Sequence, residues 1–214
     1  MHRRILVFCV LLWAELLSFR AAHAATVLDQ NYDPTIDLGE SINDGFPYAA
    51  QVVIAGIQGY LSRADLDVTA GPNSFADWMV TVNAVQGGVP TDTILASQLV
   101  PVNESTSLEV DFSSPAYFDA GDSFALVISA PSLPLHTLAG IWHGSFDEPY
   151  PAGGQAYESL DDENFSLIST EYPDSALAFD TYVNVPEPSG VPTLVATLGL
   201  LLFLRRPARL LRTN

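Results

Sequence analysis

Residues 25–185 carry an alternation of apolar and polar side chains, with a period of two, that is typical of β-strands. The clearest case is residues 108–112, in which Leu, Val and Phe alternate with two acids. Residues 77–85 alternate in the same way from Trp78 onward, and residues 123–129 form an apolar run that predicts a strand buried on both faces. Further strands are expected at residues 51–54, 57–61 and 176–183.

Turn-forming residues separate these runs. Gly with Pro, Asn, Asp or a second Gly occurs at residues 71–73, 87–90, 120–122 and 152–154. A helical pattern is found only at residues 93–98. Many short strands joined by such turns predict an all-β fold, namely an antiparallel β-sandwich.

Several of these stretches resemble bacterial secreted jelly-roll domains. The similar stretches are residues 87–97, 112–115, 120–131, 153–157 and 177–183. The resemblance implies a jelly-roll-like arrangement of the sandwich. It identifies no ligand, because one fold carries many functions.

The C-terminal tail, residues 185–214, has three parts in a fixed order. A proline-rich motif comes first and consists of Val185, Pro186, Glu187, Pro188 and Ser189. An apolar run without charges, residues 191–204, follows it and is about 21 Å long as a helix. The basic end, residues 205–214, contains Arg205, Arg206 and Arg209. Because arginines flanking a membrane span favour the cytoplasmic side, we expect one short transmembrane helix with its C-terminus inside.

This tail resembles the PEP-CTERM sorting signal of Gram-negative bacteria that make extracellular polysaccharide. The resemblance implies transient anchoring through the C-terminal helix and processing at the Pro-Glu-Pro motif. The implied partner is a membrane protease of the exosortase type. The alternative is an ordinary C-terminal anchor behind a proline-rich stalk.

Residues 1–24 have the composition of a signal peptide. Arg3 and Arg4 precede the largely apolar residues 5–17, and a small-x-small pattern predicts cleavage after Ala24. The chain is therefore expected to cross the inner membrane and to reside in the cell envelope or outside the cell. An uncleaved anchor is the alternative. Residues 25–184 then form the exported domain.

The charge of this domain is strongly negative. Arg63 is the only Arg or Lys between residues 25 and 185, against 23 acidic residues, which gives a formal charge of −22. Such a domain repels nucleic acid phosphates, so no nucleic acid partner is expected. The single cysteine, Cys9, lies in the signal peptide, which leaves no disulfide and no thiol nucleophile.

Motifs of catalysis are missing from the sequence. It contains neither the H-E-x-x-H zinc motif nor the G-x-S-x-G nucleophile motif, and His136 and His143 lie seven residues apart. We therefore expect a protein that is not an enzyme. The alternative is a secreted hydrolase or lyase that acts on carbohydrate with paired carboxylates.

Two segments are candidates for ligand binding. Trp142, Tyr150 and Tyr157 lie in a loop-rich stretch and are candidates for stacking on sugar rings. The alternative is that these aromatic residues belong to the core.

The second segment is the acidic run Asp161, Asp162 and Glu163, with Asn164 after it and Glu158 nearby. It is a candidate calcium site, because Ca²⁺ is bound by carboxylate and carbonyl oxygens. A solvated acidic loop is the alternative, and no other cofactor is expected.

Together these observations predict an exported, non-catalytic protein of the cell surface or extracellular matrix, associated with exopolysaccharide or biofilm. Surface aromatics beside acids on a shallow face would favour binding. A deep cleft with two facing carboxylates would favour an enzyme.

Overall fold

The computed structural model describes residues 25–71, 77–101, 107–130, 137–161 and 163–186. The regular elements of this part are all β-strands: β1 (Ala25–Tyr32), β2 (Leu38–Asn43), β3 (Tyr48–Ile54), β4 (Gly59–Leu66), β5 (Val68–Ala70), β6 (Trp78–Gln86), β7 (Val89–Val100), β8 (Leu108–Phe118), β9 (Ser123–Ser129), β10 (Leu138–Ser145), β11 (Ala156–Ser159), β12 (Ser166–Leu167), β13 (Ala176–Leu177) and β14 (Phe179–Val185). Within these ranges no helix has the length and apolar character to cross a membrane. The predicted signal peptide and the tail from Glu187 onward lie outside the described residues.

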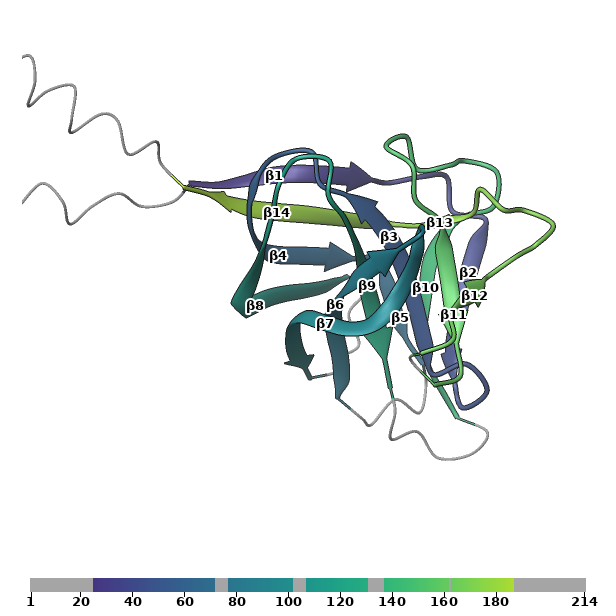
Figure 1. The fold of residues 1–214 in the computed structure, drawn as a ribbon. Helices are drawn as coiled ribbons and strands as arrows, with labels where there is room; N and C mark the ends of the chain where they lie inside the picture. The colour runs from purple at the N-terminus through teal and green to yellow at the C-terminus, as the bar shows by residue number, and fades with distance from the viewer. Residues whose placement is uncertain (1–24, 72–76, 102–106, 131–136, 162, 187–214) are drawn as a thin grey trace, which may run out of the picture. The chain divides into compact units, whose positions relative to one another are not determined.

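The strands form three antiparallel sheets (Figure 1). Sheet A has the order β1-β14-β4-β8. Sheet B has the order β13-β10-β2, with β5 also paired to β10. Sheet C has six strands in the order β12-β11-β3-β9-β6-β7. Every strand pair in the three sheets is antiparallel.

The main core draws side chains from all three sheets, which makes the molecule a β-sandwich. Leu61 comes from sheet A, Trp142 from sheet B and Phe124 from sheet C, and each is almost completely buried. Trp78 of β6 lies against Gly140 of β10, where a Cβ atom would be only 2.6 Å from the indole ring. The backbone of β10 therefore approaches the core closely enough to require glycine. The predicted all-β antiparallel sandwich is confirmed.

The strand predictions from alternation agree with the observed burial. In β8, Leu108, Val110 and Phe112 are buried, and the two acids between them are exposed. Strand β9 lies between β3 and β6, and its residues 124–129 are all buried, as the apolar run predicts. The helix that the pattern at residues 93–98 indicated is absent, because this stretch is part of the long strand β7.

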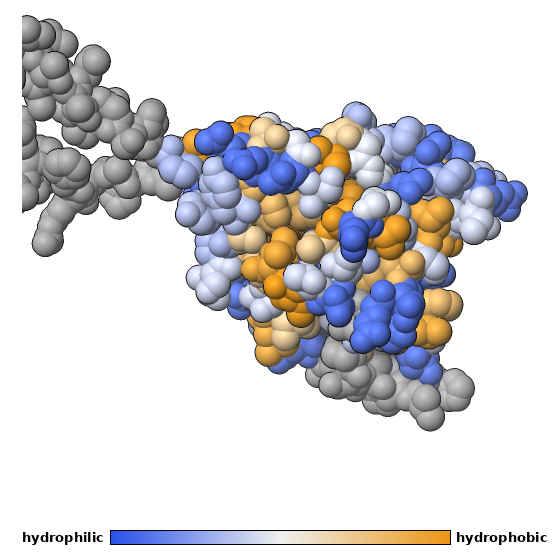
Figure 2. Space-filling view, in the orientation of Figure 1, coloured by the Kyte–Doolittle hydropathy of each residue, from blue (hydrophilic) through white to orange (hydrophobic). Residues whose placement is uncertain are grey.

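All strands and both groups of core side chains lie within Ala25–Val185, which forms one unit by its internal contacts. Every buried hydrophobic side chain among the described residues belongs to this segment. It can therefore be produced and tested without the two ends of the chain. Figure 2 shows hydrophobic and hydrophilic residues interspersed on the face of this unit that is in view.

Candidate functional site

The aromatic residues predicted to bind sugar are core residues, so this prediction is wrong. Trp142 has no exposed surface, and its indole Nε1 donates a hydrogen bond of 2.8 Å to the Ala178 carbonyl oxygen. Tyr150 is 3% exposed, and its ring lies edge-on to Phe179 with a centroid distance of 5.2 Å. A sugar cannot stack on rings that are already covered on both faces.

Tyr157 is buried on the other side of sheet C. It is 4% exposed and packs in a second apolar cluster with Ala50 and Val127. Its hydroxyl lies 3.0 Å from the Gly88 carbonyl oxygen, in the turn between β6 and β7. This residue therefore ties β11 to a distant hairpin, and the alternative assignment of the three aromatics to the core is confirmed.

The acidic run has a structural role at Asp161. Its Oδ1 accepts hydrogen bonds from the backbone N–H groups of Glu163 and Asn164, at 3.2 and 2.9 Å. Its Oδ2 accepts one from the Asn164 side chain at 2.9 Å, and these bonds to Asn164 lower the Asp161 pKa. Asp162 lies outside the described residues. Among those described, no three acids or histidines form a group that could hold a metal ion.

We expect calcium to stabilise the domain no more than an inert salt does. Among the described residues no three acids or histidines stand together, and the carboxylate of Asp161 is already held by hydrogen bonds within its own loop. The check is the thermal midpoint of residues 25–185 with calcium, magnesium or sodium at equal ionic strength. A clearly higher midpoint with calcium alone would restore the calcium site.

The outer face of sheet A carries a group of exposed aromatic side chains. Tyr60 of β4 and Tyr117 of β8 are cross-strand partners, and they are 44% and 45% exposed. Their rings meet edge to face with a centroid distance of 5.1 Å. The side chains next to them along the strands, Leu61 and Phe118, point into the core. Alternation along each strand therefore directs both tyrosines toward solvent.

A third tyrosine and the single arginine of the domain extend this group. Tyr182 of β14 is paired with Arg63 of β4, and the guanidinium carbon lies 4.8 Å from the centre of its ring. In the pairing of β4 with β14, a β-bulge at Ser62 keeps Arg63 on the same face as Tyr60. We call the outward side chains of Tyr60, Arg63, Tyr117 and Tyr182 the tyrosine face.

Acidic residues hold Arg63 in place. Its Nε and one terminal nitrogen donate to the two oxygens of Asp65, at 2.8 and 2.5 Å. The same terminal nitrogen lies 3.1 Å from a Glu109 oxygen. The hydrogen bond with Asp65 raises the Arg63 pKa further above its ordinary range. The arginine is thus fixed over Tyr182, and its charge is balanced by two carboxylates.

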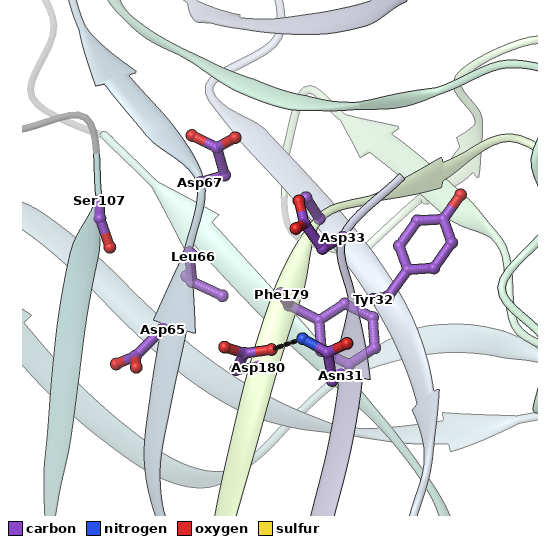
Figure 3. A pocket seen from close by; sticks show the side chains of 10 residues that line it. Asn31, Tyr32, Asp33, Asp65, Leu66, Asp67, Ser107, Phe179 and Asp180 are labelled. Atoms are coloured by element: carbon purple, nitrogen blue, oxygen red, sulfur yellow. Dashed lines mark hydrogen bonds between the residues drawn. The ribbon is translucent and has the colours of Figure 1, made fainter. Parts of the chain in front are cut away.

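A cavity of about 220 Å³ lies at one end of the tyrosine face, between β1, β4 and β14. Four aspartates are among the residues that line it (Figure 3), namely Asp33, Asp65, Asp67 and Asp180. Asp180 accepts a hydrogen bond of 2.5 Å from the Asn31 side chain, and Leu66 and Phe179 form part of the wall. We call this cavity the acidic pocket. Asp65 belongs to the lining of this pocket and is bonded to Arg63 of the tyrosine face, so the two features adjoin.

A different carboxyl pair joins a buried glutamate to a half-buried one. Glu40 of β2 is 9% exposed, and its carboxyl interacts with that of Glu158 of β11. Burial, and secondly the charge of Glu158, raise the pKa of Glu40 to about 7. Burial also raises the pKa of Glu158. A protonated Glu40 can donate to Glu158, whereas two ionised carboxylates repel each other, so the contact is more favourable while Glu40 keeps its proton.

Sequence reasoning missed the tyrosine face. One signal was available, because Tyr60 and Tyr182 each precede a buried residue, Leu61 or Val183, in an alternating strand. Alternation alone would have directed both rings away from the core. The pairing of Tyr60 with Tyr117 joins strands more than fifty residues apart and leaves no local signal.

No protein-family model and no curated protein matches the sequence. The chain is similar to a crystal structure of the cysteine protease and lectin-like domains of Cwp84, a surface layer associated protein of Clostridium difficile, with a TM-score of 0.50 and 16% identity. The match covers 75% of this chain and 36% of that chain. A second structure, of the clostridial cysteine protease Cwp84 after propeptide cleavage, matches with a TM-score of 0.49 and 15% identity over 75% and 40% of the two chains. The chain thus spans well under half of the length of these structures, and the first likeness concerns the fold alone.

Proposed function

We propose that the protein is an exported, non-catalytic binding protein of the cell surface or extracellular matrix, and that its tyrosine face binds polysaccharide. The observation that carries this proposal is the exposed pair Tyr60 and Tyr117, which lies beside carboxylates and amides on a sheet surface. Aromatic rings stack on the apolar faces of sugars, while carboxylate and amide oxygens accept bonds from hydroxyl groups. Asn184, the cross-strand partner of Tyr60, adds an amide to this surface.

Binding is favoured over hydrolysis by the shape and chemistry of this face. The tyrosines lie on the outside of a sheet, and the neighbouring cavity is small, at about 220 Å³. A glycosidase needs an acid with a raised pKa that flanks the bound sugar. The carboxyl groups of Asp29, Glu40 and Glu158 have raised pKa values, and none of them lines this cavity. The secreted hydrolase or lyase remains the second candidate function, resting on the four carboxylates of the pocket.

The remaining parts of the proposal come from the sequence. The jelly-roll-like stretches and the predicted signal peptide support an exported sandwich. The tail from Val185 to Asn214 supports sorting by an exosortase-type membrane protease, with the C-terminal helix as a transient anchor. Cwp84 is a surface layer associated protein with a lectin-like domain; the sandwich fold alone connects it to this chain.

The binding proposal is tested on a polysaccharide array with residues 25–185. We expect the wild-type domain to be retained on a subset of glycans and to release no sugar from them. The variant Tyr60→Ala/Tyr117→Ala should lose this retention, while Tyr172→Ala, which removes an exposed tyrosine elsewhere, should keep it. Sugar release by the wild-type domain would favour the hydrolase instead. Absence of binding to all glycans would contradict the proposal.

A separate prediction concerns the tail. Replacing Glu187 with Ala, or deleting residues 191–214, should block processing and surface display in the native host. The thermal midpoint of residues 25–185 should not change, because the changed residues lie outside the unit that holds the described core. Mass spectrometry of the membrane and medium fractions measures the processing.

Glu163→Ala is the matched control for Glu187→Ala, because it removes one exposed acid from the domain and leaves the tail intact. Processing of this variant should equal that of wild type. An intact tail in wild-type cells, after export, would contradict processing at the Pro-Glu-Pro motif.

A further inference from the structure

We infer that the tyrosine face and the acidic pocket together select a polysaccharide that carries free primary amines, such as a polymer of glucosamine. This inference rests on the proposed polysaccharide binding and specifies the class of glycan. Three features of the structure support it: the balance of charge on this side of sheet A, the availability of two carboxylates, and the electronic character of the aromatic rings.

The charge of the face excludes anionic polysaccharides. Arg63 is the only Arg or Lys in residues 25–185, and Asp65 and Glu109 already balance its charge. No further arginine or lysine in the domain is available to a uronic acid or a sulfated sugar. The domain as a whole, at −22, repels such polymers and attracts polycations.

Two carboxylates of the acidic pocket are available to a ligand. Asp65 is bound to Arg63, and Asp180 is bound to Asn31. Asp33 and Asp67, in contrast, have no side-chain hydrogen bond or ion pair among the residues that the structure describes. Both line the same cavity (Figure 3), and an ammonium group can donate up to three hydrogen bonds to carboxylate oxygens. A neutral sugar can donate hydroxyl hydrogen bonds to these carboxylates, but only an amine adds the attraction of opposite charges.

The tyrosines favour the same ligand. The face of an aromatic ring carries partial negative charge and attracts a cation placed over it, in addition to its contact with the sugar ring. Arg63 over Tyr182 shows this arrangement within the domain itself. Tyr60 and Tyr117 are exposed and offer aromatic surface to an amine of the ligand. A polymer with amines on successive sugars can contact the rings and the acidic pocket at once.

The test uses calorimetric titration of residues 25–185 with three oligosaccharides of equal length: glucosamine, N-acetylglucosamine and galacturonate. At about pH 6, where a primary amine carries its proton, we expect the glucosamine oligomer to bind at least about tenfold more tightly than the acetylated one. The galacturonate oligomer should not bind. Asp33→Asn/Asp67→Asn should weaken glucosamine binding about tenfold. Asp92→Asn/Asp174→Asn removes the same charge from exposed positions elsewhere and should leave it nearly unchanged.

The outcomes separate this inference from the proposed function. Equal binding of the glucosamine and acetylated oligomers, lost in Tyr60→Ala/Tyr117→Ala, would overturn the amine preference and leave polysaccharide binding intact. Glucosamine binding that falls equally in both pairs of aspartate variants would also overturn it, because general attraction to an acidic domain would then explain the result. Loss of binding only in the pocket and tyrosine variants would support it.

Discussion

Replacing Glu40 with Gln should raise the thermal stability of residues 25–185 at pH 8. The pKa of Glu40 in the folded domain is about 7, against an ordinary value of 4.5, because the carboxyl is buried beside Glu158. Since the folded pKa is the higher one, the folded state binds more protons between these values, and stability falls as pH rises from about 4.5 to about 7. Above pH 7 the ionised pair destabilises the fold, by about 3 kcal/mol at most.

Gln at position 40 removes the ionisable group and can still donate a hydrogen bond to Glu158. We therefore expect a gain of about 2–3 kcal/mol at pH 8 and little difference near pH 4. The measurement is a series of denaturant titrations across this pH range. Glu171→Gln is the matched control, because it removes one exposed charge and reports only the general relief of repulsion. Equal gains in the two variants would contradict the assigned role of the Glu40–Glu158 pair.

Replacing Trp142 with Ala should destabilise the domain by about 3–5 kcal/mol. The indole ring is fully buried, so its removal leaves a cavity in the main core. It also leaves the Ala178 carbonyl without the hydrogen bond from Nε1, which adds to the cost. A loss of this size is a large fraction of the stability of an ordinary domain, which is about 5–15 kcal/mol.

Tyr60→Ala is the comparison for this variant. The Tyr60 ring is half-exposed on sheet A and pairs with Tyr117 across the strands, so its loss should change the free energy of unfolding by no more than about 1 kcal/mol. Chemical denaturation of both variants measures the difference. If Trp142→Ala were as stable as wild type but defective in glycan binding, the assignment of Trp142 to the core would be wrong.

The fold was largely predictable from the sequence. The strands at residues 108–112 and 123–129 could be predicted because their patterns report directly whether one face or both faces of a strand are buried. The stretch at 93–98 was misassigned because a helical spacing of apolar residues also occurs in β7, where Ile94 and Leu95 are exposed. Pairing with β6, over most of the length of β7, determines its conformation.

The candidate site was not predictable in the same way. Trp142 and Tyr157 lie among Gly, Pro and acidic residues, which is the composition of an exposed loop, yet strand pairing places both inside. The contacts that bury them come from distant parts of the chain, such as Ala178 and Gly88. The tyrosine face likewise depends on the neighbours β14, β4 and β8, which are far apart in sequence.

The location of the bound glycan tests the central claim most directly. Nuclear magnetic resonance of isotopically labelled residues 25–185 can follow each amide while a glycan that binds on the array is added. The account predicts that the largest shifts occur on β4, β8 and β14, around Tyr60, Tyr117 and Tyr182, and that the amides of β11 and β12 remain unchanged. Shifts concentrated around Tyr157 and the loop at Asp161, with none on the tyrosine face, would contradict it.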